Sequence, residues 1–268
     1  MNASLCATSK ISTTSKVADS LEDLATQIDD FAQRIEDMLT AVLGPAEEQY
    51  TSTPRGYRKN GRNSFVINTH NPEGIPLTVE GRVILRLDYR YQCSFKDGSS
   101  YLQVDDSSIT LRAESDPAPI VHYDYVRNVR GSIPAAHINI HASNDSATKA
   151  MLACGTRKQG KNRRKSFIEE GKFPTFSSLH FPVGGDRFRP GLEDVLQMAA
   201  TEFAIDLQHG WQDALECSRQ DYRIKQIQAL VREFPDIAWQ TLVTEGHDIA
   251  ICPSRPIRTD RPSALIRY

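Results

Sequence analysis

Residues 83–95 read VILRLDYRYQCSF, and this stretch decides the fold. Apolar and aromatic side chains occupy every second position, and Arg86, Asp88, Arg90 and Gln92 alternate with them. Such alternation is typical of a β-strand with one buried face and one polar face. Because sheets with one solvated face are usually antiparallel, the pattern predicts a long strand in an antiparallel sheet.

Further strands are expected directly downstream. Asp97-Gly98 is a strong hairpin signal that turns the chain back after the long strand. The alternation then resumes in several stretches: Tyr101–Val104, Ile109–Ala113, Ile120–Val126 and Ala136–Ala142. Their connections are too short for parallel crossovers, so these strands are expected to form an antiparallel meander.

The N-terminal part has a helical period instead. From about Val17 to Leu43, apolar side chains recur at alternating intervals of four and three residues: Val17, Leu21, Leu24, Ile28, Phe31, Ile35, Met38 and Val42. This heptad stripe predicts an amphipathic helix that ends at Gly44-Pro45. Alanines widen the stripe, which leaves two interpretations open. The helix packs on the protein's own core or C-terminal helices, or it forms a dimerising coiled coil.

Irregular and helical segments fill the rest of the chain. Residues 45–64 and Arg157–Lys165 are expected to be loops, and Ser177–Phe181 a short strand. Helices are expected at these places: Ser146–Cys154, Pro190–Leu207, Trp211–Phe234 and Pro235 to about Gly246.

The predicted fold class is therefore α+β, with an antiparallel β-meander sheet flanked by a long N-terminal helix and a C-terminal helical segment. The expected division has these parts: a disordered tail at 1–15, the N-terminal helix at 16–44, the sheet domain at 45–190, the helical segment at 191–250 and an extended tail at 251–268.

Composition limits both the compartment and the partners. Hydrophobic residues make up 39% of the 268 residues, which is enough apolar material for a core. The net charge of −2 means that any affinity for nucleic acid must come from a local patch of cations. Five widely spaced cysteines, with neither zinc nor redox spacing, indicate free thiols in a reducing cytosol. With no signal peptide and no apolar run of roughly 20 residues, we expect a cytoplasmic protein that does not enter a membrane.

Two predicted strands place histidines and an aspartate on one sheet face. Their apolar residues, among them Ile138 and Ile140, are expected to point inward, which leaves these outward: His122, Asp124, His137, Asn139 and His141. An imidazole titrates near neutral pH, so His137 or His141 paired with Asp124 has the chemistry of a general acid or base. The alternative is an ordinary solvated sheet face.

A substrate of this face would approach from the loop that carries His180 and Arg187. His137 and His141 lie about 13 Å apart along a regular strand, which argues against a metal held by both. No metal and no cofactor is therefore expected.

The order of Tyr123-Asp124-Tyr125 followed by Pro134-Ala135-Ala136-His137-Ile138-Asn139-Ile140-His141 resembles the layout of small TumE-type toxins of bacterial toxin–antitoxin pairs. The resemblance covers about residues 83–142. It implies a growth-inhibitory protein with an antitoxin partner and a functionally important histidine-bearing strand. This chain is longer, and Tyr125 and Arg127 stand where the family pattern has an Asn and a further His. The second half, around residues 180–190, resembles uncharacterised actinobacterial proteins, which implies no activity.

A dense basic segment follows the predicted sheet. It holds six cations within nine residues: Arg157, Lys158, Lys161, Arg163, Arg164 and Lys165. Each can neutralise a phosphate and release a counterion, so the segment predicts salt-sensitive binding to RNA or another polyanion. The alternative is a solvated loop without a partner.

A Gly-Gly loop precedes the predicted helix at Pro190. Gly184-Gly185 before a helix start can hold a phosphate on backbone N–H groups, and Arg187 and Arg189 would add contacts. Glu193 and Asp194 in the first helical turn oppose a bound anion. The alternative is a tight turn closed by an Arg–acid contact.

These features support two hypotheses of different classes. The first is an RNA-cleaving, toxin- or defence-like protein, in which His137 or His141 acts as acid or base, Asp124 orients it, and Arg and Lys stabilise the phosphate charge. The second is a non-catalytic protein that assembles through residues 17–43 and binds a polyanion or an acidic partner through the basic segment.

Overall fold

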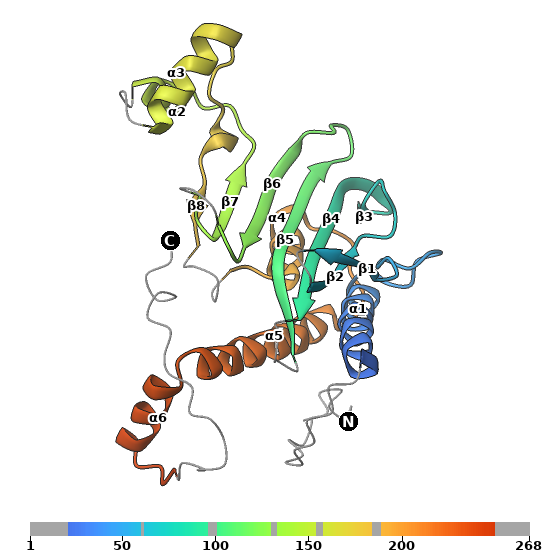
Figure 1. Ribbon diagram of the computed structural model, residues 1–268. Helices are drawn as coiled ribbons and strands as arrows, with labels where there is room; N and C mark the ends of the chain where they lie inside the picture. The colour runs from blue at the N-terminus through green and yellow to red at the C-terminus, as the bar shows by residue number, and fades with distance from the viewer. Residues whose placement is uncertain are drawn as a thin grey trace.

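The computed structural model of the chain describes residues 21–59, 62–95, 101–129, 133–153, 158–183 and 189–249. These residues form an antiparallel sheet, one N-terminal helix and a set of C-terminal helices, so the predicted α+β class is confirmed. Figure 1 shows the strands as a fan, with helix α4 behind it. The two predicted tails, Asp97-Gly98 and Gly184-Gly185 lie outside the described residues.

The sheet has eight strands, and every neighbouring pair is antiparallel. Their order across the sheet is β1 (Arg55–Lys59), β2 (Arg62–Asn68), β4 (Arg82–Phe95), β5 (Leu102–Ala113), β6 (Pro119–Val126), β7 (Ala136–Ile140) and β8 (Phe181–Pro182). Strand β3 (Ile75–Val79) also pairs with β4. The long strand predicted over 83–95 is thus confirmed as β4.

Other expectations about the sheet were wrong. Residues 45–64, expected to be a loop, contain β1 and the start of β2. Strand β1 is an edge strand with few apolar residues, so no alternation marks it. Asn60-Gly61, a dipeptide typical of hairpins, separates the two strands in the sequence and was the available signal. The two short strands expected within 101–113 are one strand, β5, whose register shifts opposite Gln92 and Cys93.

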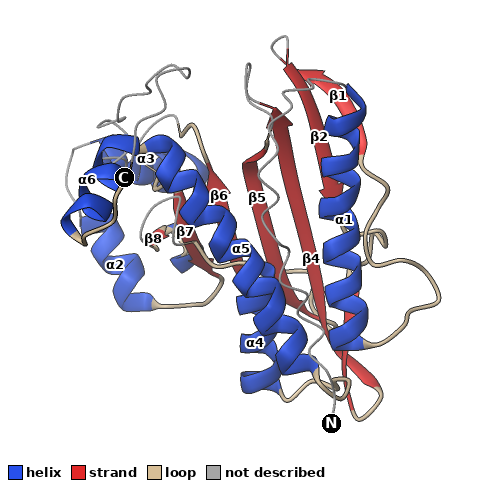
Figure 2. Ribbon diagram, turned by 90° about the horizontal axis from the view of Figure 1, so that it is seen from below, coloured by secondary structure: helices blue, strands red, loops and turns tan. Residues whose placement is uncertain are grey.

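Helix α1 (Leu21–Leu43) packs on one face of the sheet together with α4 (Leu192–Phe203) and α5 (Trp211–Glu233), as Figure 2 shows from below. The shared core includes these fully buried side chains: Leu39, Val42, Leu87, Leu111, Leu196 and Leu215. In the protein's own core, Ile28, Ile35, Met38 and Val42 of the heptad stripe are buried, and Phe31 packs against them partly buried. This is the first of the two interpretations of the stripe, and it leaves that stripe unavailable to a coiled-coil partner.

Smaller helices lie at two corners of the molecule. Helices α2 (Asp145–Ala153) and α3 (Lys158–Glu170) lie beyond β7 and β8, and α6 (Pro235–Thr244) follows α5 (Figure 1). The segment expected as strand Ser177–Phe181 is a 3-10 turn, η1 (Phe176–Ser178), followed by β8. In the described part of the chain, every helix is too short or too polar to cross a membrane.

The expectation of a basic loop was wrong, because most of that segment belongs to α3. Lys, Arg, Gln and Glu are good helix formers, and their summed helix propensity outweighs the cost of Gly160. Gly160 is also buried, so its lack of a side chain suits the packing.

Candidate functional site

The register of β5, β6 and β7 brings polar residues into two adjoining rows on the sheet face away from the helical core. The rows read, from β5 to β7, Ser108–Asp124–His137 and Thr110–His122–Asn139. The two strands that carry the histidines and Asp124, β6 and β7, therefore lie side by side.

Five side chains on this face form a continuous run of contacts, which we call the His–Asp cluster. The ring of His180 lies 4.8 Å from that of His137, centroid to centroid. His137 Nε2 is 3.8 Å from Asp124 Oδ2, and the same oxygen is 4.0 Å from His122 Nδ1. The ring of His122 lies 4.7 Å from that of His141. Four of the seven histidines are thus linked to one carboxylate, His137 and His122 directly and His180 and His141 through their rings.

His137 lies on the polar face but is only 6% exposed. Its Nδ1 is 3.0 Å from the carbonyl oxygen of Pro134. Its strand neighbour Pro182 and the ring of His180 cover it from the η1–β8 segment. His137 thus points to the polar face as the alternation predicts, but it is covered there by a segment far away in the sequence.

The η1–β8 segment is also tied to the second row. Asn139 Nδ2 donates a hydrogen bond of 2.8 Å to the carbonyl oxygen of Ser177. Ile140, expected to point inward, pairs with Val121 but is 38% exposed. Since directly paired residues share a face, Ile140 lies on the inward face with Val121, and its exposure reflects its position at the end of the strand.

Asp124 was expected to hydrogen-bond either His137 or His141. The structure places it between His137 and His122 instead. Both separations exceed a hydrogen bond and correspond to electrostatic contact. His141 reaches Asp124 only through His122.

Burial is the main reason why the pKa of His122 lies below its ordinary value of 6.5; Asp124 opposes the shift and His141 adds to it. Burial likewise lowers the pKa of His180, and the neighbouring His137 and Arg163 lower it further against the effect of Asp124. Both imidazoles therefore favour the neutral form near pH 7, which is the form that accepts a proton.

Two buried polar atoms in the second row have no hydrogen-bond partner within the described residues: His122 Nε2 and Asn139 Oδ1. Leaving such a group unsatisfied costs about 1–3 kcal/mol. Unsatisfied polar atoms at adjacent positions of a sheet could form hydrogen bonds with a polar ligand.

The basic segment is only partly directed at this cluster. Arg163 of α3 lies close enough to His180 to influence its pKa. Arg164 Nε donates to the carbonyl oxygen of Leu152, and Lys165 forms an ion pair with Glu169 at 3.7 Å. Lys161 is exposed, while Arg157 and the side chain of Lys158 lie outside the described part of the structure.

The Gly-Gly loop and Arg187 lie outside the described residues, but the helix start after them is clear. Asp194 caps α4 by accepting the N–H of Gly191 at 2.9 Å, and it also accepts Arg219 Nε at 3.0 Å. The guanidinium of Arg189 stacks 3.9 Å from the ring centre of Tyr125. Asp194, which would repel an anion bound at this helix start, thus closes the turn through its own hydrogen bonds.

Sequence reasoning missed the acid partners of the other cations on this face. Arg86 forms an ion pair with Glu114, and Arg112 lies 3.7 Å from Asp88. Only the strand register, which no local pattern encodes, could have found them.

No group of three or more metal-ligating side chains gathers in the ranges that the structure describes. Of the thiols there, Cys93 and Cys217 are not joined in a disulfide. Burial raises the pKa of Cys93 to about 12, so this thiol is not a nucleophile near neutral pH.

Fold and site together define an α+β protein with a histidine-rich polar sheet face. Comparison with models of protein families, with curated proteins and with solved structures finds no match to the chain. The function is therefore argued from the site.

Proposed function

We propose that the protein cleaves RNA and acts as a toxin- or defence-like enzyme through its His–Asp cluster. The observation that carries the proposal is the run of contacts that joins four histidines with Asp124. Arg163 of the basic helix is near enough to His180 to lower its pKa. RNA carries the 2′-hydroxyl that an imidazole base can activate, and its phosphate suits a neighbouring guanidinium.

In the proposed reaction, neutral His180 accepts the proton of the 2′-hydroxyl. The 2′-oxygen then forms a bond to phosphorus, the bond from phosphorus to the 5′-oxygen breaks, and that oxygen takes a proton from water. The hydroxide left behind takes the proton from His180 and restores both water and the neutral imidazole. The products are a 2′,3′-cyclic phosphate and a 5′-hydroxyl. Arg163 stabilises the negative charge that grows on the phosphate.

His137 is a positioning residue in this proposal. Its Nδ1 lies 3.0 Å from the carbonyl oxygen of Pro134 and its Nε2 lies 3.8 Å from Asp124, and these contacts hold the ring against His180. The sequence alone favoured His137 or His141 as acid or base. We favour His180 because its ring contacts His137 and because Arg163 lies near enough to lower its pKa.

The experiment is cleavage of a single-stranded RNA oligonucleotide by the full chain. His180→Ala is expected to lower the rate by at least about 100-fold, the usual contribution of a general base. His209→Ala, an exposed histidine before α5, is the matched control and should keep the full rate. A DNA oligonucleotide of the same sequence lacks the 2′-hydroxyl and should not be cut.

His137→Ala separates positioning from contact with substrate. It should lower the rate and change its pH profile, since His180 loses a neighbour that lowers its pKa. In a bacterial host, wild type should arrest growth and His180→Ala should not. Full cleavage by His180→Ala would refute the proposal.

A further inference from the structure

Exposed apolar side chains gather at the end of α5 and on α6. Of the thirteen large hydrophobic residues exposed in the described part of the chain, seven fall within 224–243: Ile224, Ile227, Val231, Ile237, Trp239, Leu242 and Val243. Scattered apolar residues are ordinary on a surface, but a contiguous set marks an interaction site. This surface lies apart from the His–Asp cluster and is independent of RNA cleavage.

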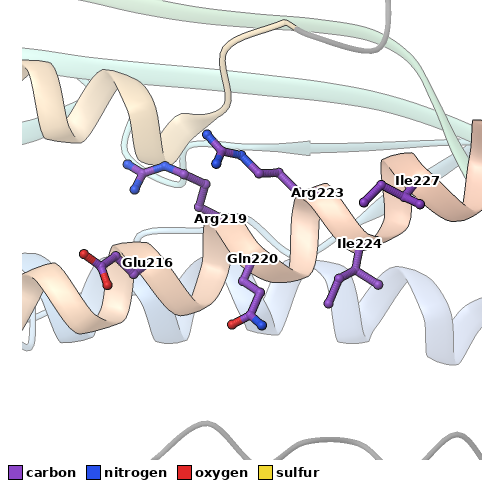
Figure 3. Close-up of a pocket in the computed structure, with 6 residues that line it drawn as sticks. All are labelled: Glu216, Arg219, Gln220, Arg223, Ile224 and Ile227. Atoms are coloured by element: carbon purple, nitrogen blue, oxygen red, sulfur yellow. The ribbon is translucent and has the colours of Figure 1, made fainter.

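On α5 these residues form one stripe. Ile224, Ile227 and Val231 recur at helical spacing, so they share a face. The same face holds a shallow, open groove of about 360 Å³, drawn in Figure 3, whose lining residues all belong to α5: Glu216, Arg219, Gln220, Arg223, Ile224 and Ile227.

Helix α6 has the length that fits this groove. Its ten residues span roughly 15 Å, and the groove from Glu216 to Ile227 runs for a similar distance along α5. Helix α6 buries none of its own residues, although it is rich in apolar side chains. An apolar helix in this state calls for a partner.

Within one chain, α6 cannot reach the groove. Phe234 alone caps both the end of α5 and the start of α6, and a helix needs a connection of about 2–5 residues to fold back along its neighbour. In Figure 1, α6 turns away from the end of α5. The helix that fills the groove must therefore come from another molecule.

We infer that a second copy of this chain docks here, with α6 of each copy in the α5 groove of the other. Residues 233–249 carry acids and no Lys or Arg, while the groove presents Arg223. Arg223 and Glu245 have no ion-pair partner among the described residues, so the exchange joins an unpaired cation with an unpaired acid. The arrangement is reciprocal and closes on itself as a two-fold dimer.

The test is the mass of the full chain in solution by light scattering or sedimentation. Wild type should have twice the mass of one chain, and Ile224→Glu with Ile227→Glu should have the mass of one. Leu242→Glu on α6 should do the same. Ile168→Glu, an equally drastic change at an isoleucine that is 78% exposed on α3, is the matched control and should stay dimeric.

Charge reversal tests the register of the exchange. Arg223→Glu should weaken the dimer at least roughly tenfold, and adding Glu245→Arg should restore it. In a Trp211→Phe background, Trp239 is the remaining tryptophan, and its emission should shift to the blue as the dimer forms. A wild type that stays monomeric at every concentration, or a dimer that the groove and α6 variants leave intact, would overturn the inference.

Discussion

The two faces of the sheet come from the same strands but differ in character, since one packs in the core and the other carries polar side chains. On β5, Leu111 is fully buried under the helices, whereas Thr110 beside it faces the row of His122. The apolar face is closed by α1, α4 and α5, and the polar face carries the His–Asp cluster. The difference teaches that stability and candidate chemistry can be changed separately along one strand, one residue apart.

The largest effect is expected from a charge placed in the closed face. Ile28 of α1 is 2% exposed, so Ile28→Asp forces a carboxylate into apolar contact. We expect a loss of about 4 kcal/mol or more in the free energy of unfolding, measured by urea denaturation. Asp29→Ala, at an exposed position of the same helix, should change it by less than about 0.5 kcal/mol. Equal effects of the two variants would mean that α1 does not pack as described.

A cavity on the closed face should cost less than a buried charge. Leu111→Ala is expected to lower the free energy of unfolding by about 2–5 kcal/mol, since it removes a fully buried side chain. Thr110→Ala, on the opposite face of the same strand, should cost much less. A similar loss from both variants would remove the distinction between the faces.

Much of this two-faced sheet follows from the sequence, because alternation is a local property. The pattern over 83–95 predicts β4 and its buried tyrosine and leucine positions, and the same rule puts Asp124 and His122 on the polar face. Strand β1 was not predicted, because this edge strand has too few apolar residues to show an alternating pattern.

The rest of the site depends on contacts between distant segments. His137 is covered by η1 and β8, which follow only after α2 and α3. Arg163 of α3 influences the pKa of His180, and no periodicity of the sequence encodes their proximity. The heptad stripe of α1 left two partners open, and only packing against the sheet decided between them.

Charge-reversal variants of the cations of α3 should differ in their affinity for RNA and should change the stability of the fold little. Arg163→Glu should weaken RNA binding and lower the slope of log affinity against log salt by about 1. Arg164→Glu with Lys165→Glu should have a smaller effect, because these residues contact Leu152 and Glu169 within the helical corner. Filter binding at several salt concentrations measures both. Unchanged affinity in all three positions would remove α3 from the RNA site.

The smallest effect concerns the pH dependence of stability, and it tests the polar face directly. In the unfolded chain His122 takes up a proton near its ordinary pKa of 6.5, whereas in the fold its pKa is lowered, chiefly by burial. Below pH 6.5 the unfolded state therefore binds more protons than the native state, so the free energy of unfolding falls as the pH falls. His122→Gln cannot take up that proton and should flatten the decline in this window, while His180 preserves part of it. Thr110→Ala, at the neighbouring position of the same row, does not titrate and should keep the wild-type slope. Denaturation curves from neutral pH to below 6.5 measure the slopes; a His122→Gln profile as steep as wild type would show that the imidazole on this face is no harder to protonate than one in water.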